Sequence, residues 1–481
     1  MPESNDRHPL NRRRFLRGIA LAAGGSVLAA CGAAPAAPAA TNAPADAATS
    51  VPAATGATSA PAVTEATSAP AVTTSRTKLV IMIEPAELND EAQQQLMTAI
   101  PDVEIELVKS DLTRYYSMAA AGTPPDILRV QAPDVPQLLS RDILLDLSPY
   151  FASSAVLKID DLAPANNYYK ANSPTEIGSG NIYGMTKDWS PDFTLFANKK
   201  AFAEANVPLP STTEPMTYAQ LAEIGTKLTK KEGDRTLRWG LGFFNELTDR
   251  IVMNILAEQD QRLYTDDFSR IRLTDNPPAQ EALRYFFDLA KAGVIASPVN
   301  PSPSWTGDDF TKGTVAIAQY GYWFQAMAES DETKGEVVML PAPTWSGKRL
   351  NPTMTATGLV VSRATKSPDL AWKVFEWYMG GQPALDRFAS GWGVPSLNSK
   401  LDLLPSTTDF HKQTRMVLDG ELPYAEQPLQ FNPYINGGTF NTVWTKHFES
   451  ALRDQTTFEQ LLQNVETDMN AAIQDGKDQL G

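Results

Sequence analysis

Beyond residue 76 the chain alternates short apolar stretches with longer amphipathic ones. In one of the short stretches, Val103–Val108, apolar and acidic residues alternate with the period of two that is typical of a half-exposed strand. On this basis strands are predicted over Leu79–Ile83, Val103–Val108 and Asp126–Val130, with helices between them at Glu87–Ile100 and Thr113–Ala121. This order indicates right-handed crossovers and a mainly parallel sheet in an α/β fold.

The alternation continues through the second half of the chain. Further strands are predicted over Trp239–Phe244, Val315–Tyr320, Val337–Leu340 and Gly358–Arg363. Asn276-Pro277 and Ser367-Pro368 predict helix starts, because proline is favoured in the first helical turn. The chain has 481 residues. At roughly 100–200 residues per domain, this length predicts two domains or one large bilobal unit.

The N-terminus is predicted to direct export. Residues 11–17 are rich in arginine, and the apolar stretch Ile19–Ala30 that follows is shorter than the roughly 20 residues needed to span a bilayer. The run from Arg12 to Arg17 resembles the twin-arginine export motif. We therefore predict a cleavable signal peptide over residues 1–30.

The single cysteine lies directly after this apolar stretch. Leu28-Ala-Ala-Cys31 resembles a bacterial lipobox, in which the cysteine becomes the acylated first residue of the mature protein. From Gly32 to Ser75 the chain is almost wholly Ala, Thr, Pro and Ser, with no large apolar side chain to bury. Residues 31–76 are therefore predicted to be a lipid-anchored, disordered linker.

Composition limits the chemistry that the chain offers. One cysteine and three histidines leave no Cys/His set for a zinc site or for a Cys–His nucleophile pair, so no metal and no cofactor are predicted. Phosphate-binding loops, a dinucleotide fingerprint and a Gly-x-Ser-x-Gly elbow are missing from the sequence. The formal net charge of −15 argues against nucleic acid as a partner.

Carboxylates leave one enzyme class open. A glycoside hydrolase needs two Asp or Glu residues about 5–10 Å apart in space, which requires no sequence signature. Asp266-Asp267 and Asp308-Asp309 are adjacent pairs, but adjacent side chains usually point in different directions. A membrane-tethered glycoside hydrolase is kept as the alternative, and a binding protein for a non-sugar solute such as a polyamine is a third hypothesis.

Tryptophan is the informative residue type. Several tryptophans lie in Gly-, Pro- or polar-flanked contexts instead of apolar periodic runs, namely Trp189, Trp305, Trp323 and Trp392. Flat rings on loops stack on the C–H faces of sugars, while nearby carboxylates and amides bind the hydroxyls. The pattern favours carbohydrate binding.

Six segments together resemble the extracellular solute-binding proteins of ABC importers, the family that includes maltose-binding protein. The resemblance covers nearly all of residues 77–481. Its segments, in the family's order, are Met118–Ile127, Leu144–Tyr150, Asn181–Thr186, Phe196–Phe202, Phe310–Trp323 and Gly391–Pro395. Lys187 stands near a position where proline is common in the family.

The resemblance implies a two-lobed periplasmic-binding-protein fold with hinge crossings. The expected parts are a first lobe over 77–190, a second lobe over 191–352, a return to the first lobe over 353–390, and C-terminal helices, mainly in the second lobe, over 391–481. It also implies a monomeric binding protein, with no catalytic residues, that delivers a mono- or oligosaccharide to the membrane subunits of an ABC permease. The protein is expected on the outer face of the bacterial cytoplasmic membrane.

The ligand is expected beyond the carboxyl ends of the strands, as in open α/β sheets generally. Trp323 and Trp392 are predicted to stack on it, and Trp189 is predicted either to stack or to pack in the hinge. Glu84 and Asp188 are predicted to accept hydroxyl hydrogen bonds. The complete predicted set of ligand-binding residues is Glu84, Gln131, Asp134, Asp188, Trp189, Tyr322, Trp323, Thr357 and Trp392.

Overall fold

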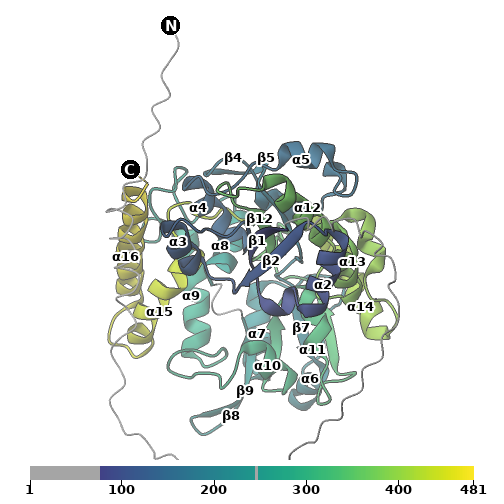
Figure 1. Cartoon of the computed structure of the whole chain (residues 1–481). Helices are drawn as coiled ribbons and strands as arrows, with labels where there is room; N and C mark the ends of the chain where they lie inside the picture. The colour runs from purple at the N-terminus through teal and green to yellow at the C-terminus, as the bar shows by residue number, and fades with distance from the viewer. Residues whose placement is uncertain (1–75, 244–247, 481) are drawn as a thin grey trace, which may run out of the picture. The chain divides into compact units, whose positions relative to one another are not determined.

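The computed structural model describes residues 76–243 and 248–480, so the predicted signal peptide, Cys31 and nearly all of the predicted linker lie outside it. Two five-stranded sheets form the framework (Figure 1). The first has the order β2-β1-β3-β12-β6, with bounds Val103–Val108, Thr77–Met82, Ile127–Val130, Gly358–Val361 and Gly184–Thr186. The second has the order β11-β7-β10-β9-β8, with bounds Val337–Leu340, Leu195–Asn198, Val315–Gln319, Arg235–Gly242 and Lys230–Glu232.

The first sheet is parallel at its N-terminal strands and antiparallel where the chain returns. β1 pairs in parallel with β2 and β3, as the strand and helix order predicted. β12 pairs antiparallel with β3 and β6. In the second sheet β10 and β9 are parallel, whereas β7 is antiparallel to β10 and β11. A hairpin of β4 (Lys170–Ser173) and β5 (Glu176–Ile182) stands apart from both.

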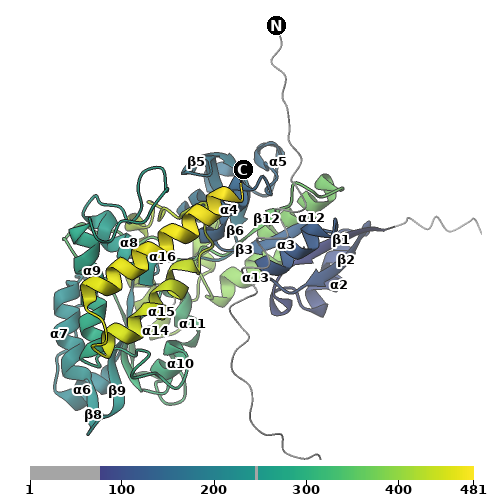
Figure 2. The same ribbon diagram turned by 90° about the vertical axis from the view of Figure 1, so that its left-hand side faces the viewer.

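The helices divide between the two sheets. Those grouped with the first sheet are α2 (Asp90–Ala99), α3 (Leu112–Ala120), α4 (Val135–Ser140), α5 (Ser148–Ser153), α12 (Pro368–Gly380) and α13 (Gln382–Ser390). Those grouped with the second are α6 (Lys199–Ala205), α7 (Tyr218–Leu228), α8 (Thr248–Glu258), α9 (Pro277–Lys291), α10 (Thr306–Thr311), α11 (Gln325–Ala328), α14 (Asp409–Glu421), α15 (Thr439–Leu452) and α16 (Phe458–Asp478). Figure 2 shows the two groups separately, with α2, α3 and α12 beside β1 and β3, and α6 and α7 beside β9. We call them the first and second lobes.

Local sequence explains where these elements begin. Asn89 accepts a hydrogen bond from the Ala92 amide at the start of α2, and Asp111 accepts from two amides at the start of α3. Such caps satisfy amides that have no partner within the helix. The α2 helix therefore begins at Asp90, after the cap, and not at Glu87 as the apolar pattern predicted.

The core consists of two clusters of buried apolar residues. The smaller lies against one face of the first sheet, where Leu79, Ile81 and Val361 meet Phe375 of α12. The larger cluster packs against the opposite face of the first sheet, where it includes Met82 and Leu128, and it continues without interruption through the second lobe. Because successive strand residues point to opposite faces, one strand serves both clusters.

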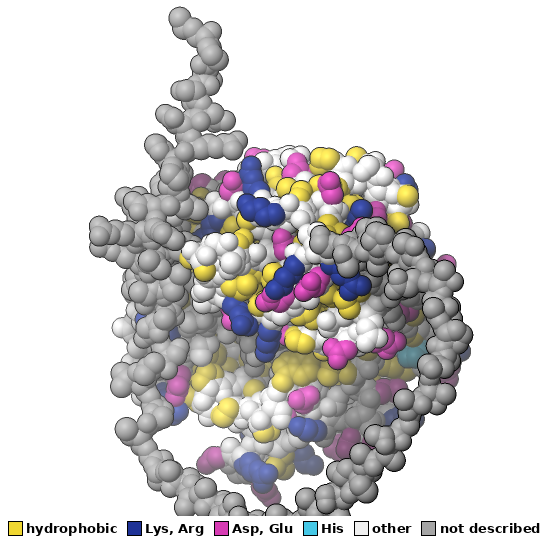
Figure 3. Space-filling view, viewed as in Figure 1, with side chains coloured by type: hydrophobic (Ala, Val, Ile, Leu, Met, Phe, Trp, Pro, Cys, Tyr) yellow, Lys and Arg dark blue, Asp and Glu magenta, His cyan; other side chains and the backbone are white. Residues whose placement is uncertain are grey.

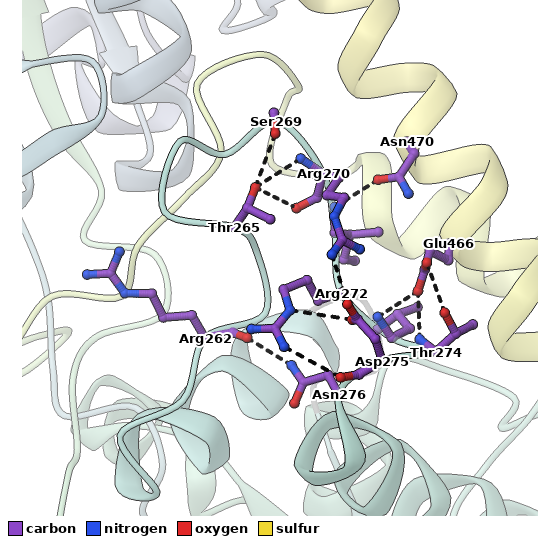
Figure 4. A network of polar contacts seen from close by, with 12 residues as sticks. Arg262, Thr265, Ser269, Arg270, Arg272, Thr274, Asp275, Asn276, Glu466 and Asn470 are labelled. Atoms are coloured by element: carbon purple, nitrogen blue, oxygen red, sulfur yellow. Dashed lines mark hydrogen bonds and ion pairs between the residues drawn. The ribbon is translucent and has the colours of Figure 1, made fainter.

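The C-terminal helix is fastened to the second lobe by polar contacts. The carboxylate of Glu466 on α16 accepts hydrogen bonds from the amides of Leu273 and Thr274 at 2.8 and 2.6 Å (Figure 4). Asn470, one helical turn later, accepts from the Ile271 amide at 2.8 Å. The loop before α9 is thereby held along α16, which lies beside α15 in both views.

Charge on the surface is mixed. On the face viewed in Figure 3, Lys and Arg side chains are interspersed with Asp and Glu side chains and do not form a field of one sign. Among the helices of the described residues, none has the length and apolarity needed to cross a membrane.

Candidate ligand-binding site

Two chain segments run between the sheets and are hydrogen-bonded to each other. Residues 187–194 connect β6 to β7, and residues 341–357 connect β11 to β12. The Thr357 carbonyl accepts from the amides of Lys187 at 2.8 Å and Asp188 at 3.3 Å. The amide of Asp192 donates to the Pro352 carbonyl at 3.1 Å. Within residues 76–243 and 248–480 these two crossings link the sheets before β12, and the chain crosses once more between α13 and α14.

Asp192 is a buried carboxylate at the centre of these crossings. It accepts hydrogen bonds from the Met354 amide at 2.6 Å, the Thr353 hydroxyl at 2.9 Å and the Ser190 hydroxyl at 2.8 Å. The indole of Trp323 also donates to it. Burial raises the pKa of Asp192, and these hydrogen bonds oppose that shift. One side chain therefore joins both crossings and fixes a tryptophan.

Gly321 allows Trp323 to approach the crossings. Trp323 lies in a short 3-10 helix, Tyr322–Phe324, directly after β10. A Cβ atom at Gly321 would lie 2.1 Å from both the Asp192 Oδ1 and the Ser190 Oγ, which is far inside contact distance. Only glycine is compatible with this approach.

Trp323 belongs to a group of aromatic rings. It stacks on Trp305 with 6.2 Å between ring centroids and 19° between planes, and Tyr320 meets its ring edge to face at 5.4 Å. Trp392 lies 5.8 Å from it at 48° and keeps 47% of its surface exposed. Trp392 lies two residues after the end of α13, which packs on α12 of the first lobe, so rings from both lobes meet here.

A chain of alternating charges lies under the first-lobe side of the site. The Lys187 ammonium, only 3% exposed, contacts the carboxylate of Asp188 and lies 3.2 Å from that of Glu87. Glu87 in turn accepts from the Arg129 guanidinium at 3.0 Å. Two cations and two carboxylates balance, so the burial of Lys187 leaves no unpaired charge. Asp188 retains 20% of its side-chain surface.

The structure brings some of the predicted site residues together. Trp323 and Trp392 are in contact. Asp188 lies close to the loop that carries Trp392, since a Cβ built on Gly393 would lie 3.1 Å from the Cβ of Asp188. Thr357 is 5% exposed and takes part through its carbonyl. Glu84 and Gln131 are half-buried and precede 3-10 turns at the ends of β1 and β3.

Other predicted residues lie elsewhere. Trp189 is 3% exposed and donates from its indole to the Pro395 carbonyl at 3.0 Å, so in this conformation it packs in the hinge. Tyr322 is fully buried beside Thr414 and Arg415 of α14, and burial raises its pKa to about 12. Its ring faces the second-lobe core, because adjacent residues of a 3-10 helix point in different directions.

Asp134 faces the C-terminal segment of the chain. Its carboxylate accepts from the Gly437 amide at 3.3 Å. Burial raises its pKa, while the hydrogen bond from Gly437 and the nearby Arg250 guanidinium oppose that rise. Arg250 donates to the Met354 carbonyl at 2.9 Å and is itself buried. Asp134 thus contributes to contacts between lobes at the crossing.

Asp192 and Trp305 were missed as site residues by the sequence reasoning. Trp305 has the same loop context as Trp323 and so carried a usable signal, whereas Asp192 is marked in the sequence only by its closeness to the predicted Trp189. Within residues 76–243 and 248–480, no group of three or more His, Cys, Asp or Glu side chains is placed to hold a metal ion.

Comparison with known proteins agrees with this geometry. The profile of the family described as bacterial extracellular solute-binding protein matches residues 91–414. Comparison with curated protein sequences finds no match. Solved structures are similar in fold: an ABC substrate-binding protein from Listeria monocytogenes, in complex with cycloalternan, superposes with a TM-score of 0.68 at 19% identity, over 82% of this chain and 98% of that one.

Two further structures show the same likeness. The sugar-binding protein MalE of Xanthomonas citri has a TM-score of 0.63 at 16% identity, over 83% of this chain and 98% of its own. A solute-binding protein from Thermotoga lettingae bound to α-D-tagatose has a TM-score of 0.63 at 17% identity, over 83% of this chain and 100% of its own. These likenesses confirm the predicted two-lobed α/β fold.

Proposed function

Because the chain belongs to the bacterial extracellular solute-binding proteins, we propose that it binds a carbohydrate between its lobes and delivers it to an ABC importer. Membership identifies the chain as a binding protein that acts outside the cytoplasm, not as an enzyme, which removes the glycoside hydrolase alternative. The observation that carries the carbohydrate assignment is the contact of Trp323 with Trp392 at the crossing of the lobes.

The chemistry of the site supports a sugar. Indole rings offer flat apolar surface that matches the C–H faces of a pyranose. The partly exposed carboxylate of Asp188 adds a hydroxyl acceptor beside the rings. The similar proteins from Listeria monocytogenes and Thermotoga lettingae were solved with cycloalternan and tagatose, both carbohydrates.

Delivery would depend on closure of the lobes. A ligand that touches residues of both lobes gains contacts in the closed form that the open form lacks, and so it shifts the population toward closure. The paired crossings tied by Asp192 are a suitable hinge, since few backbone segments have to bend. The closed form would be recognised by the permease.

Alanine at Trp323 is expected to weaken saccharide binding by about 1–3 kcal/mol, the value of a stacked ring and its buried area. Isothermal titration with the saccharide that most raises the melting temperature in a thermal-shift screen measures the loss. Stability is measured in parallel, because the variant also loses the hydrogen bond to Asp192.

The matched control is Trp377→Ala. Trp377 is a half-buried tryptophan on α12 that packs against the first-lobe core and lies outside the ring group. Its loss should lower stability and leave affinity unchanged. Unaltered affinity in Trp323→Ala would remove that ring from the site, and a screen in which no saccharide raises the melting temperature would contradict carbohydrate binding.

We also propose that the protein is exported by a twin-arginine-type signal and anchored through an acylated Cys31. The Cys31→Ser variant is expected to lose metabolic labelling by palmitate and to move from the detergent phase to the aqueous phase in partition assays. Cys31 is the single cysteine of the chain, so no other thiol takes its place.

Substitution of Arg12 and Arg13 together by lysine tests the export route separately. Loss of export with an intact lipobox would support the twin-arginine signal, whereas unchanged export would indicate the general secretory route. Retention of Cys31→Ser in the detergent phase would contradict the lipid anchor.

A further inference from the structure

Lys187 is a buried cation at the first-lobe edge of the proposed saccharide site. It directly follows β6, at the start of the first crossing, and only 3% of its side chain is exposed. The position lies near one where the family commonly has proline, so the fold itself does not require a lysine here. Because a buried ammonium group is costly unless it is paired, a lysine at this point calls for a functional reason.

The Lys187 ammonium is shared by two carboxylates. It contacts the carboxylate of Asp188 and lies 3.2 Å from that of Glu87. Glu87 also accepts from the Arg129 guanidinium through both of its oxygens, at 3.0 and 3.1 Å. Since Arg129 already neutralises Glu87, Lys187 is the direct counterion of Asp188.

Asp188 is the member of this pair that reaches the surface beside the tryptophans. Its side chain is 20% exposed, whereas that of Lys187 is 3% exposed. Its Cβ would lie 3.1 Å from a Cβ built on Gly393, the residue after Trp392. A ligand stacked on the tryptophans would therefore meet the carboxylate of Asp188 and not the ammonium of Lys187.

The contact with Lys187 determines which ligand groups the Asp188 carboxylate favours. Where water is scarce, opposite charges attract and like charges repel strongly, so a partly buried carboxylate without a counterion would favour a ligand that carries an ammonium group. The Lys187 ammonium cancels the charge of Asp188 and repels a second cation. The carboxylate still accepts hydrogen bonds from neutral hydroxyls, because it offers about four lone-pair sites.

The far side of this charge group is closed by α12 and α13. The hydroxyl of Tyr378 on α12 donates to the Glu87 carbonyl at 3.1 Å. The Arg387 guanidinium on α13 lies 4.4 Å from the centre of the Tyr378 ring. Arg387 thus adds a further positive charge behind the group, which acts in the same direction as Lys187.

We propose that Lys187 is a specificity-determining residue that restricts the site to uncharged saccharides. By cancelling the charge of Asp188, it leaves a hydroxyl acceptor and removes a binding place for a cation, so amino sugars and polyamines are rejected. This inference rests on the proposed function, because it names the class of carbohydrate that the same site takes. It acts through Asp188, since Lys187 itself is too buried to touch the ligand.

The experiment compares neutral sugars with their amino analogues. Isothermal titration near neutral pH uses the pairs glucose and glucosamine, mannose and mannosamine, galactose and galactosamine, and cellobiose and the disaccharide of glucosamine. The measured quantity is the affinity for the amino sugar relative to that for the neutral sugar of the same pair. In Lys187→Met, which removes the charge from a buried side chain, this ratio is expected to rise roughly tenfold or more, because Asp188 then has no counterion.

A second variant shifts the charge in the opposite direction. Glu87→Gln leaves Lys187 and Arg129 with Asp188 as their single partner, so the group carries one excess positive charge. The affinity for glucuronate and galacturonate, relative to glucose and galactose, is expected to rise roughly tenfold in this variant. This gain decides the question if Lys187→Met does not fold.

The matched control is Lys446→Met. Lys446 is an exposed residue of α15 whose ammonium lies 2.7 Å from the carboxylate of Asp468, so its loss changes the net charge of the protein as Lys187→Met does. Its ratios should equal those of the unchanged protein. Unchanged ratios in Lys187→Met and Glu87→Gln, with both members of each pair affected alike, would overturn the role of Lys187 alone. Absence of binding by every neutral sugar would instead overturn the proposed function.

Discussion

Replacement of Asp192 by alanine is expected to lower the free energy of unfolding by about 3–5 kcal/mol. The buried carboxylate accepts hydrogen bonds from Met354, Thr353 and Ser190, and the indole of Trp323 also donates to it. Each buried donor left without a partner costs roughly 1–3 kcal/mol. Urea unfolding followed by far-ultraviolet circular dichroism measures the loss.

The conservative control is Asp192→Asn. An amide oxygen in place of Oδ2 retains the bonds from Met354 and Thr353, and the amide nitrogen faces the Ser190 hydroxyl, which is able to accept. We expect this variant to lose about 1–2 kcal/mol, because only the bonds with Ser190 and with the Trp323 indole are open to disturbance and each has a net value of about 1 kcal/mol. Equal stability of Asp192→Ala and the unchanged protein would show that these donors find other partners, and the hinge would not depend on Asp192.

The strands could be predicted from the sequence because their pattern is local. The predicted strands at Val103–Val108 and Val337–Leu340 are confirmed without any change in their bounds. The strand predicted at Leu79–Ile83 lies at Thr77–Met82: it starts two residues earlier and ends one residue earlier, and its start reaches the polar Thr77 because pairing with β2 continues that far. Hydrogen bonding between strands ends where the partner strand ends, which an apolar pattern does not record.

The candidate site was predictable only in part, because it is assembled from distant segments. Gly and polar neighbours marked Trp323 and Trp392 as loop residues, and the structure brings them into contact. The role of Asp192 could not be predicted, since its partner Met354 is 162 residues away. The direction of Tyr322 likewise depends on α14, which lies far along the chain from β10.

A buried glutamate is expected to make stability depend on pH. Glu258, the last residue of α8, is 3% exposed, and burial raises its pKa to about 7 even though its Oε2 accepts from the amides of Trp345 and Ser346. The unfolded chain releases this proton near pH 4.5. Between these values the native state binds more protons than the unfolded state, so stability falls as the pH rises.

The variant Glu258→Gln isolates this effect. Its amide oxygen still accepts from the Trp345 amide, but it carries no charge to bury. The stability of Glu258→Gln relative to the unchanged protein is expected to rise by about 2–3 kcal/mol from pH 5 to pH 8, because one pKa unit corresponds to about 1.4 kcal/mol. Urea unfolding of both proteins at half-unit steps of pH measures this difference.

The control variant for this pH series is Glu332→Gln. Hydrogen bonding to Ser330 lowers the pKa of Glu332, so this carboxyl is ionised in both the native and unfolded states above pH 5. Its stability difference from the unchanged protein should therefore stay constant up to pH 8. A constant difference for Glu258→Gln as well would mean that Glu258 is ionised in the native state throughout. In that case the hydrogen bonds from the Trp345 and Ser346 amides lower the pKa of Glu258 by more than burial raises it.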